Sequence, residues 1–150
     1  MYTFYTYPEL KDLSVGSRIA FVRKLRRKTQ DNISKELGLT SDNRRRTMTR
    51  YEKGERNPKE ERTREIANIL DVSYNSIKYY DFSNKSDLFY LLMWIEELYP
   101  NFGFKMNLQS DEKISNAFIE WNEMKKKRLN EEITYEEYIE WKLKYEIDKE

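Results

Sequence analysis

Apolar residues recur every three or four positions through residues 16–80, which is the spacing of helices that bury one face in a core. The first helix is predicted at the start of this range, where Ile19, Val22 and Leu25 share one face. Basic residues cover its other faces: Arg18, Arg23, Lys24, Arg26, Arg27 and Lys28. We therefore expect a helix that packs on one side and is charged on the others.

A second helix is predicted directly after the first. Thr29 is a suitable N-cap, because its hydroxyl can accept hydrogen bonds from the unpaired N–H groups of the first turn. Ile33 and Leu37 would face the core, and Gly38 would end the helix in a left-handed conformation.

The third predicted helix covers RRRTMTRYE, residues 44–52, and Gly54 stops it. Met48 and Tyr51 lie three positions apart and would form its buried side. The outer side would carry long polar side chains: Arg45, Arg46, Thr47, Thr49 and Arg50.

Two more helices complete this half. Asn57, Pro58 and Glu60 suggest a capping box, with Asn57 as cap and Pro58 in the first helical position. This fourth helix would run to about Leu70, and Ser73 would cap a short fifth helix.

Residues 81–150 follow a different pattern. A strongly apolar helix starts near Asp87, and Pro100 and Gly103 end it. Apolar and polar residues then alternate over residues 102–109, which predicts a short strand or hairpin arm.

Two amphipathic helices end the chain. The first covers residues 110–129, and Thr134 and Glu137 form a capping box that opens the second. We assign the tryptophans to core packing rather than to a ligand cage: Trp94, Trp121 and Trp141. The fold class expected from the whole pattern is mostly α.

Charge separates the two halves. The net charge of the chain is only +1, but residues 14–80 carry 17 Lys and Arg against 9 Asp and Glu, a net charge of +8. Residues 81–150 carry 10 against 16, a net charge of −6. A basic half joined to an acidic half is typical of nucleic-acid-binding proteins.

Two short helices joined by a glycine turn, the second rich in arginine, form a helix-turn-helix pattern. An α-helix fits the major groove of DNA, where arginine can make two hydrogen bonds to guanine. A run such as Arg44, Arg45 and Arg46 is usually only a solvated face. Within this pattern and this basic half, we expect at least one of the three to contact DNA.

Three segments resemble the Cro/lambda-repressor-like (XRE) helix-turn-helix family: TQDNISKELGLT, MTRYEKGERNP and EIANILDVSYNSI. Ile33-Ser34 occupies the family's L-A positions, and residues 48–52 occupy I-S-R-W/Y-E. The likeness spans roughly residues 16–80 and implies a five-helix DNA-binding domain. About four extra residues within SDNRRR precede the third helix, so which arginine reaches a base stays open.

The resemblance implies roles for matching positions. Gln30 would bind a phosphate or buttress the recognition helix, and Thr49 and Arg50 would touch the DNA backbone or a base edge. Phosphate contacts are implied for residues that follow the third helix: Lys53, Arg56, Asn57 and Lys59. Phosphate contacts position a protein on DNA, whereas base contacts specify sequence.

Residues 86–150 are similar, more weakly, to the tails of XRE-type regulators from Gram-positive bacteria. Both carry a Trp-bearing helix, a short I-T-x-E-E-Y turn and another Trp-bearing helix. This likeness implies no activity, and dimerisation, sensing and partner docking all stay open. Residues 1–15 form an N-terminal arm whose aromatic residues would pack on the chain's own surface or on a second subunit: Tyr2, Phe4, Tyr5 and Tyr7.

The chain has no Cys and no His. Their absence excludes disulfides, nearly all zinc sites and histidine catalysis, so we expect no enzyme, no metal and no cofactor. An enzyme would need a polar pocket within residues 86–150. No stretch approaches the roughly 18 apolar residues of a membrane span, and we expect a cytoplasmic protein.

These features predict a sequence-specific DNA-binding transcriptional regulator, a repressor of bacterial or mobile-element origin. It would bind double-stranded DNA as a homodimer on a near-palindromic operator. The alternative is an antitoxin-like or immunity regulator, in which residues 86–150 bind a partner protein and DNA binding serves autoregulation.

Overall fold

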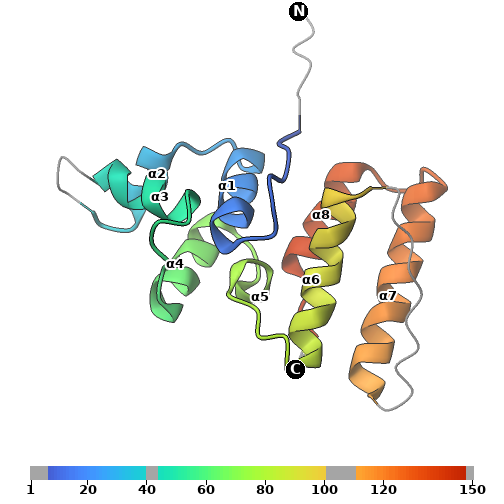
Figure 1. Cartoon of the computed structure of the whole chain (residues 1–150). Coiled ribbons are helices and arrows are strands. Elements are labelled where there is room, and N and C mark those ends of the chain that lie inside the picture. The colour runs from blue at the N-terminus through green and yellow to red at the C-terminus, as the bar shows by residue number, and fades with distance from the viewer. Residues whose placement is uncertain (1–6, 40–43, 101–110, 148–150) are drawn as a thin grey trace, which may run out of the picture. The chain divides into compact units, whose positions relative to one another are not determined.

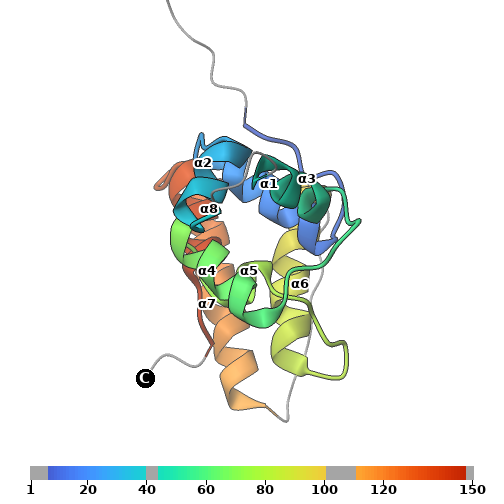
Figure 2. The same cartoon turned by 90° about the vertical axis from the view of Figure 1, so that its left-hand side faces the viewer.

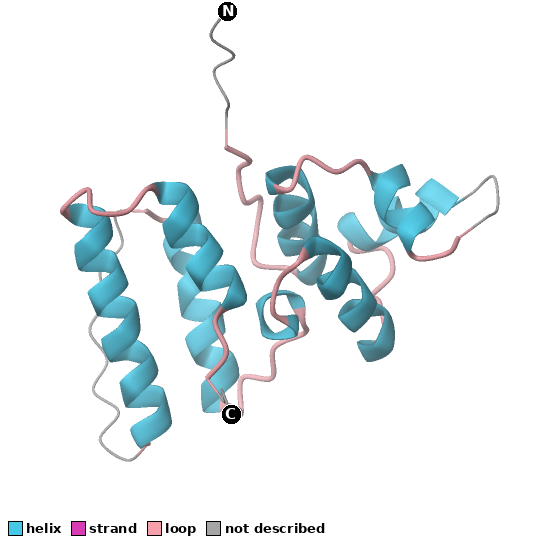
Figure 3. Cartoon of the chain, turned by 180° about the vertical axis from the view of Figure 1, so that it is seen from behind, coloured by secondary structure: helices cyan, strands magenta, loops and turns pink. Residues whose placement is uncertain are grey.

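The computed structural model describes residues 7–39, 44–100 and 111–147. Over these ranges the chain is mostly helical, with eight α-helices and no strand, so the expected mostly α class is confirmed (Figures 1 and 3). The strand or hairpin predicted at 102–109 lies outside the described residues, as do residues 1–6 of the arm. No helix in the described ranges is long and apolar enough to cross a membrane.

Contacts divide the chain into two compact units, unit 1 over Met1–Lys78 and unit 2 over Tyr79–Glu150. Unit 1 holds the first five helices: α1 (Val15–Leu25), α2 (Gln30–Glu36), α3 (Arg44–Glu52), α4 (Glu60–Leu70) and α5 (Tyr74–Ile77). Unit 2 holds the other three: α6 (Lys85–Leu98), α7 (Glu112–Leu129) and α8 (Tyr135–Lys144).

Side-chain caps start several of these helices where the sequence predicts them. Thr29 caps α2 and forms a capping box with Asn32, and Ser73 caps α5. Thr134 and Glu137 form the predicted capping box of α8. Each cap satisfies backbone N–H groups that have no partner within the helix, so the helix starts are fixed locally.

The start of α4 differs from the prediction. The helix begins at Glu60 with Lys59 in the N-cap position, so the expected capping box of Asn57 and Glu60 is wrong. The Glu60 carboxylate instead accepts from Arg64, with Oε1 3.1 Å from Nε and 2.9 Å from Nη2. A cation four residues along a helix is a competing partner for a carboxylate, so Glu60 does not turn back to the cap.

Every helix of unit 1 contributes at least one fully buried apolar side chain: Ile19, Ile33, Met48, Ile66, Leu70 and Ile77. The predicted buried side of α3, Met48 and Tyr51, is confirmed. Leu25 and Leu37 are only half-buried, because each lies at the end of its helix.

Helices α1 and α3 lie next to each other (Figure 2). Their backbones come closest at Gly16, near the start of α1. A Cβ atom at this position would lie 2.2 Å from the carbonyl oxygen of Tyr51 and 2.8 Å from that of Glu52. Only glycine lacks that atom, so Gly16 sets the distance between α1 and the end of α3.

Arg18 is predicted on an exposed face of α1, and this is wrong, because only 2% of its surface is accessible. Its guanidinium donates to three backbone carbonyls, those of Leu13 at 3.1 Å, Ser76 at 2.9 Å and Lys78 at 2.8 Å. The last carbonyls of a helix such as α5 need donors, and a long cation from another helix supplies them here.

Unit 2 has an aromatic core where α6, α7 and α8 lie alongside one another (Figure 3). The Phe89 ring centroid lies 5.1 Å from that of Phe118 and 5.7 Å from that of Trp121, both edge-on. Trp94 and Trp121 are buried, which confirms their assignment to the core, and Trp141 is half-buried.

A buried polar network also joins the three helices of unit 2. Glu96 Oε1 accepts from the Tyr138 hydroxyl at 2.5 Å and from Lys142 Nζ at 3.2 Å. Glu96 Oε2 lies 3.1 Å from Lys125 Nζ, and Trp121 Nε1 donates to the Tyr138 oxygen at 2.8 Å. Because its members are mutually satisfied, this network can stay buried without the cost of an unpaired charge.

Candidate nucleic-acid interface

Helix α3 carries most of the residues predicted to contact DNA, and hydrogen bonds with α2 hold it in place. The buried Ser34 hydroxyl donates to the backbone carbonyl of Arg44 at 3.0 Å. The Thr49 hydroxyl donates to Gln30 Oε1 at 2.9 Å, with the carbonyl of Arg45 as an alternative acceptor at 3.1 Å. These bonds fix both the position and the rotation of α3 against α2.

Gln30 is predicted to bind a phosphate or to buttress the recognition helix. In the structure its side-chain oxygen accepts from Thr49, which is the geometry of a buttress. An amide whose oxygen is engaged still has two N–H donors on its nitrogen. The same side chain therefore can brace α3 and donate to an anion.

An ion pair attaches the end of α3 to α1. Arg23 binds the Glu52 carboxylate at two points, each with a 2.8 Å separation, and donates from Nη1 to the carbonyl of Lys28 at 2.9 Å. The side chains of Arg23 and Glu52 are only 12% and 8% exposed. Bidentate geometry and low exposure make this pair a rigid joint rather than a surface contact.

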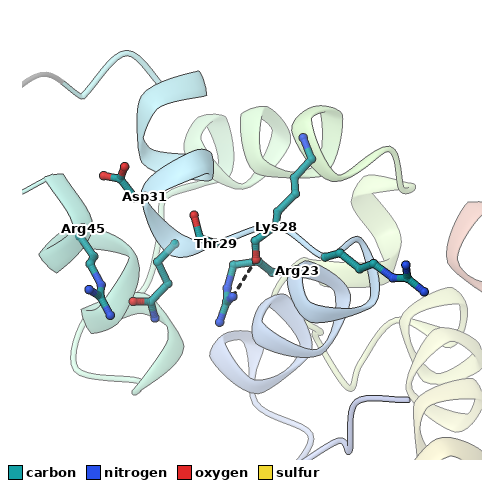
Figure 4. A pocket seen from close by; sticks show the side chains of 7 residues that line it. Arg23, Lys28, Thr29, Asp31 and Arg45 are labelled. Atoms are coloured by element: carbon teal, nitrogen blue, oxygen red, sulfur yellow. Dashed lines mark hydrogen bonds between the residues drawn. The ribbon is translucent and has the colours of Figure 1, made fainter. Parts of the chain in front are cut away.

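A hollow of about 560 Å³ lies where α1, α2 and α3 meet (Figure 4). Arg45 from α3 and Arg23 from α1 approach it from opposite sides. Four of its seven lining residues are cations, namely Arg23, Arg27, Lys28 and Arg45. The other three are Thr29, Gln30 and Asp31. The composition favours an anion over a neutral or cationic ligand.

Two of these cations are balanced by nearby carboxylates. Glu52 neutralises Arg23, and Glu36 lies 2.8 Å from Lys28. Arg45 is exposed and has no ion-pair partner among the described residues. The unbalanced positive charge that α3 brings to the hollow is therefore that of Arg45.

Arg44 lies in a different environment from the two arginines that follow it. Its Nε is 2.7 Å from Asp31 Oδ1, and its Nη2 is 3.4 Å from Asp31 Oδ2. The Arg44 guanidinium, helped by Lys35, holds the pKa of Asp31 below its usual value, so this carboxylate stays charged. Arg44 thus braces α3 against α2.

The remaining predicted residues of α3 are accessible to different extents. Arg46 and Arg50 are exposed, while Thr47 and Thr49 are half-buried. Arg50 lies 3.9 Å from Glu55 across an exposed pair, which contributes little. Both guanidinium groups are therefore available to a ligand from solvent.

The segment between α3 and α4 holds the predicted phosphate contacts. Lys53, Asn57 and Lys59 are exposed. The exposed Arg56 has its guanidinium carbon 5.9 Å from the centre of the Tyr51 ring, a loose cation–π contact. All four lie in the segment that follows α3, and none of them lines the hollow between α1, α2 and α3.

Three cations of the hollow were not predicted as site residues: Arg23, Arg27 and Lys28. Arg27 and Lys28 directly precede the cap Thr29, and Arg23 lies one helical turn before them. This closeness in sequence is the only signal that could have grouped them with Gln30. The partner of Arg23 lies 29 positions away, and no local pattern indicates it.

Among the described residues no group of acidic side chains is placed to hold a metal ion. Comparison of the chain with protein-family models, with curated proteins and with solved structures found no match. Function is therefore inferred from the residues and their geometry.

Proposed function

We propose that unit 1 binds double-stranded DNA sequence-specifically, with α3 in the major groove, and that the protein is a transcriptional repressor. The observation that carries the proposal is the first turn of α3, which holds Arg44, Arg45 and Arg46 and no acidic residue. Cations at a helix N-terminus oppose the helix dipole, at a cost of about 0.3–1 kcal/mol each. Asp31 offsets only one of them.

The unbalanced charges face solvent on an otherwise well-anchored helix. Buried Met48 and Tyr51 pack α3 on the core. Ser34 and Arg23 hold its two ends, and Gln30 binds Thr49 between them. A rigid helix with a cationic outer surface matches the long, regular line of phosphates that flanks a DNA groove. Lys53, Arg56, Asn57 and Lys59 would extend this contact along the backbone.

The proposed DNA site is near-palindromic, with half-sites about one helical turn apart, because a dimer presents two copies of α3. Unit 2 would supply dimerisation, sensing or docking of a partner protein. The expected location of such a regulator is the cytoplasm.

The test begins with selection of bound duplexes from a random library by the full-length protein. Binding of a selected duplex is then compared between wild type and Arg45→Ala/Arg46→Ala/Arg50→Ala by fluorescence anisotropy. We expect the triple variant to lose at least about 100-fold in affinity, since it removes both base and phosphate contacts.

A matched control removes three positive charges from unit 2 instead, with Lys85→Ala/Lys126→Ala/Lys127→Ala, all at exposed positions. The affinity of this control variant for the selected duplex should stay within a few-fold of the wild-type affinity. Equal affinity of wild type and the α3 variant would refute the interface. Failure to select any duplex would favour the antitoxin-like alternative, in which the main partner is a protein.

A further inference from the structure

The three consecutive arginines of α3 point in three different directions. One residue turns an α-helix by about 100°, so positions on α3 can be compared with the buried pair Met48 and Tyr51. Arg44 lies within about 40° of both, Arg45 lies about 60° from Met48 and about 120° from Tyr51, and Arg46 lies about 140–160° from each. Arg46 is therefore on the face opposite the core.

The contacts agree with this order. Arg44, nearest the core, pairs with Asp31 and is occupied in holding α3. Arg45, on the flank, lines the hollow between α1, α2 and α3. Arg46 is exposed, lines no part of that hollow, and has no ion-pair partner among the described residues.

The outer face of α3 also fits base reading at Arg46. It is the third residue of the helix, and residues near the N-terminus of a recognition helix are the ones that reach base edges. Thr49 and Arg50 lie three and four positions later, so they share this face. Arg45, directed to a basic hollow beside the groove-facing surface, is placed for a phosphate instead.

We propose that Arg46 is the arginine that reads a base edge, with guanine O6 and N7 as acceptors, and that Arg45 contacts the DNA backbone. Arg44 stays on Asp31 and contacts no DNA. This inference rests on the proposed DNA-binding function and adds the division of labour within the arginine run.

The experiment uses the full-length protein and single substitutions Arg44→Ala, Arg45→Ala and Arg46→Ala. Affinity is measured for a selected duplex and for a random-sequence duplex of equal length, from about 50 to about 200 mM salt. The ratio of the two affinities reports base reading, and the slope of affinity against salt reports phosphate contacts.

We expect Arg46→Ala to lower the affinity ratio about 10–100-fold and to relax the preference at one base pair of each half-site. Arg45→Ala should weaken binding to both duplexes alike, keep the ratio within about twofold and reduce the salt slope by about 1. Arg44→Ala should change neither quantity and should lower the unfolding midpoint, as Asp31→Asn should.

The variant Arg46→Lys separates base reading from charge. It keeps the positive charge but loses the two-point geometry of the guanidinium, so the ratio should fall while the salt slope is retained. A ratio kept in both Arg46 variants, or a ratio lost in Arg44→Ala or Arg45→Ala, overturns the assignment although DNA binding stands. A wild-type protein with no preference for any duplex overturns the proposed function itself.

Discussion

Arg23 and Glu52 join the last turn of α1 to the last residue of α3 through two parallel hydrogen bonds of 2.8 Å. Glu52→Ala should destabilise unit 1 by about 3 kcal/mol, because it leaves a mostly buried guanidinium without its counter-ion. Urea unfolding measures this loss. Glu55→Ala, which removes only an exposed partner 3.9 Å from Arg50, should change stability by less than about 0.5 kcal/mol.

The double variant Arg23→Met/Glu52→Leu provides a second comparison. Replacing both charges with apolar groups of similar size leaves no buried charge unpaired, so it should be more stable than Glu52→Ala. If Glu52→Ala unfolds at the same urea concentration as wild type, the pair does not act as a joint between α1 and α3.

Gly16→Ala should destabilise unit 1 although alanine favours helices. The gain in helix propensity is about 1 kcal/mol, whereas a Cβ 2.2 Å from the Tyr51 carbonyl oxygen forces backbone apart. We expect a net loss of about 2 kcal/mol, together with changed amide NMR shifts throughout α3.

Gly54→Ala is the matched control for Gly16→Ala. Gly54 has a φ of +75°, but no atom lies within 4 Å of the position that an added Cβ would take. The cost of this substitution is therefore confined to the left-handed backbone, about 1 kcal/mol. The close approach of α1 and α3 is supported if Gly54→Ala changes amide NMR shifts only in the turn at Gly54, while Gly16→Ala changes them across α3. Equal and local effects of both substitutions would contradict it.

Tyr138→Phe should destabilise unit 2 by about 2 kcal/mol. The change removes the hydroxyl that donates to Glu96 and accepts from Trp121 Nε1, and it leaves both buried groups short of a partner. Burial and the neighbouring Glu96 carboxylate raise the pKa of Tyr138, so its proton is present at all ordinary pH values.

Tyr99→Phe is the control for Tyr138→Phe, because Tyr99 is 58% exposed. It should leave the midpoint of thermal unfolding unchanged within error. If the midpoint of Tyr138→Phe also equals that of the wild type, the hydroxyl of Tyr138 contributes nothing to stability.

Unit 2 should lose stability in acid through Glu96. Burial alone would raise its pKa, but Lys142, Tyr138 and Lys125 together hold the pKa below the ordinary value of 4.5. A folded-state pKa below the unfolded one contributes stability above pH 4.5 that is lost as the pH falls through the folded value.

Urea unfolding of wild type and Glu96→Gln between about pH 3 and pH 6 tests this linkage. The variant cannot ionise at position 96, so the stability difference between the two proteins should shrink as the pH falls. A difference that is constant over this range would contradict the role of Glu96.

Local sequence signals predicted the helices well. The caps Thr29, Ser73 and Thr134 and the spacing of Met48 and Tyr51 lie within one or two turns of the structure they specify. Signals of this kind are complete within a short window, so they can be read without knowledge of the fold.

Long-range pairings could not be predicted in the same way. The environments of Arg18 and Arg23 depend on groups 29 to 60 positions away, and a cation on a helix reads as solvated until its partner is known. Even the nearby Arg44 could not be distinguished from Arg45 and Arg46, because its pairing with Asp31 depends on how α3 is rotated against α2. The different environments of the three arginines therefore could not be predicted without the structure.

Arg18 links the first helix of unit 1 to the end of the unit. Arg18 lies in α1, and its guanidinium binds the backbone carbonyls of Ser76 and Lys78, the last residues of unit 1. Chain ends are poorly ordered unless they are tied down, so these hydrogen bonds should limit fraying at the end of unit 1. We therefore expect the five helices of unit 1 to stay folded when the chain is joined to another protein after Lys78.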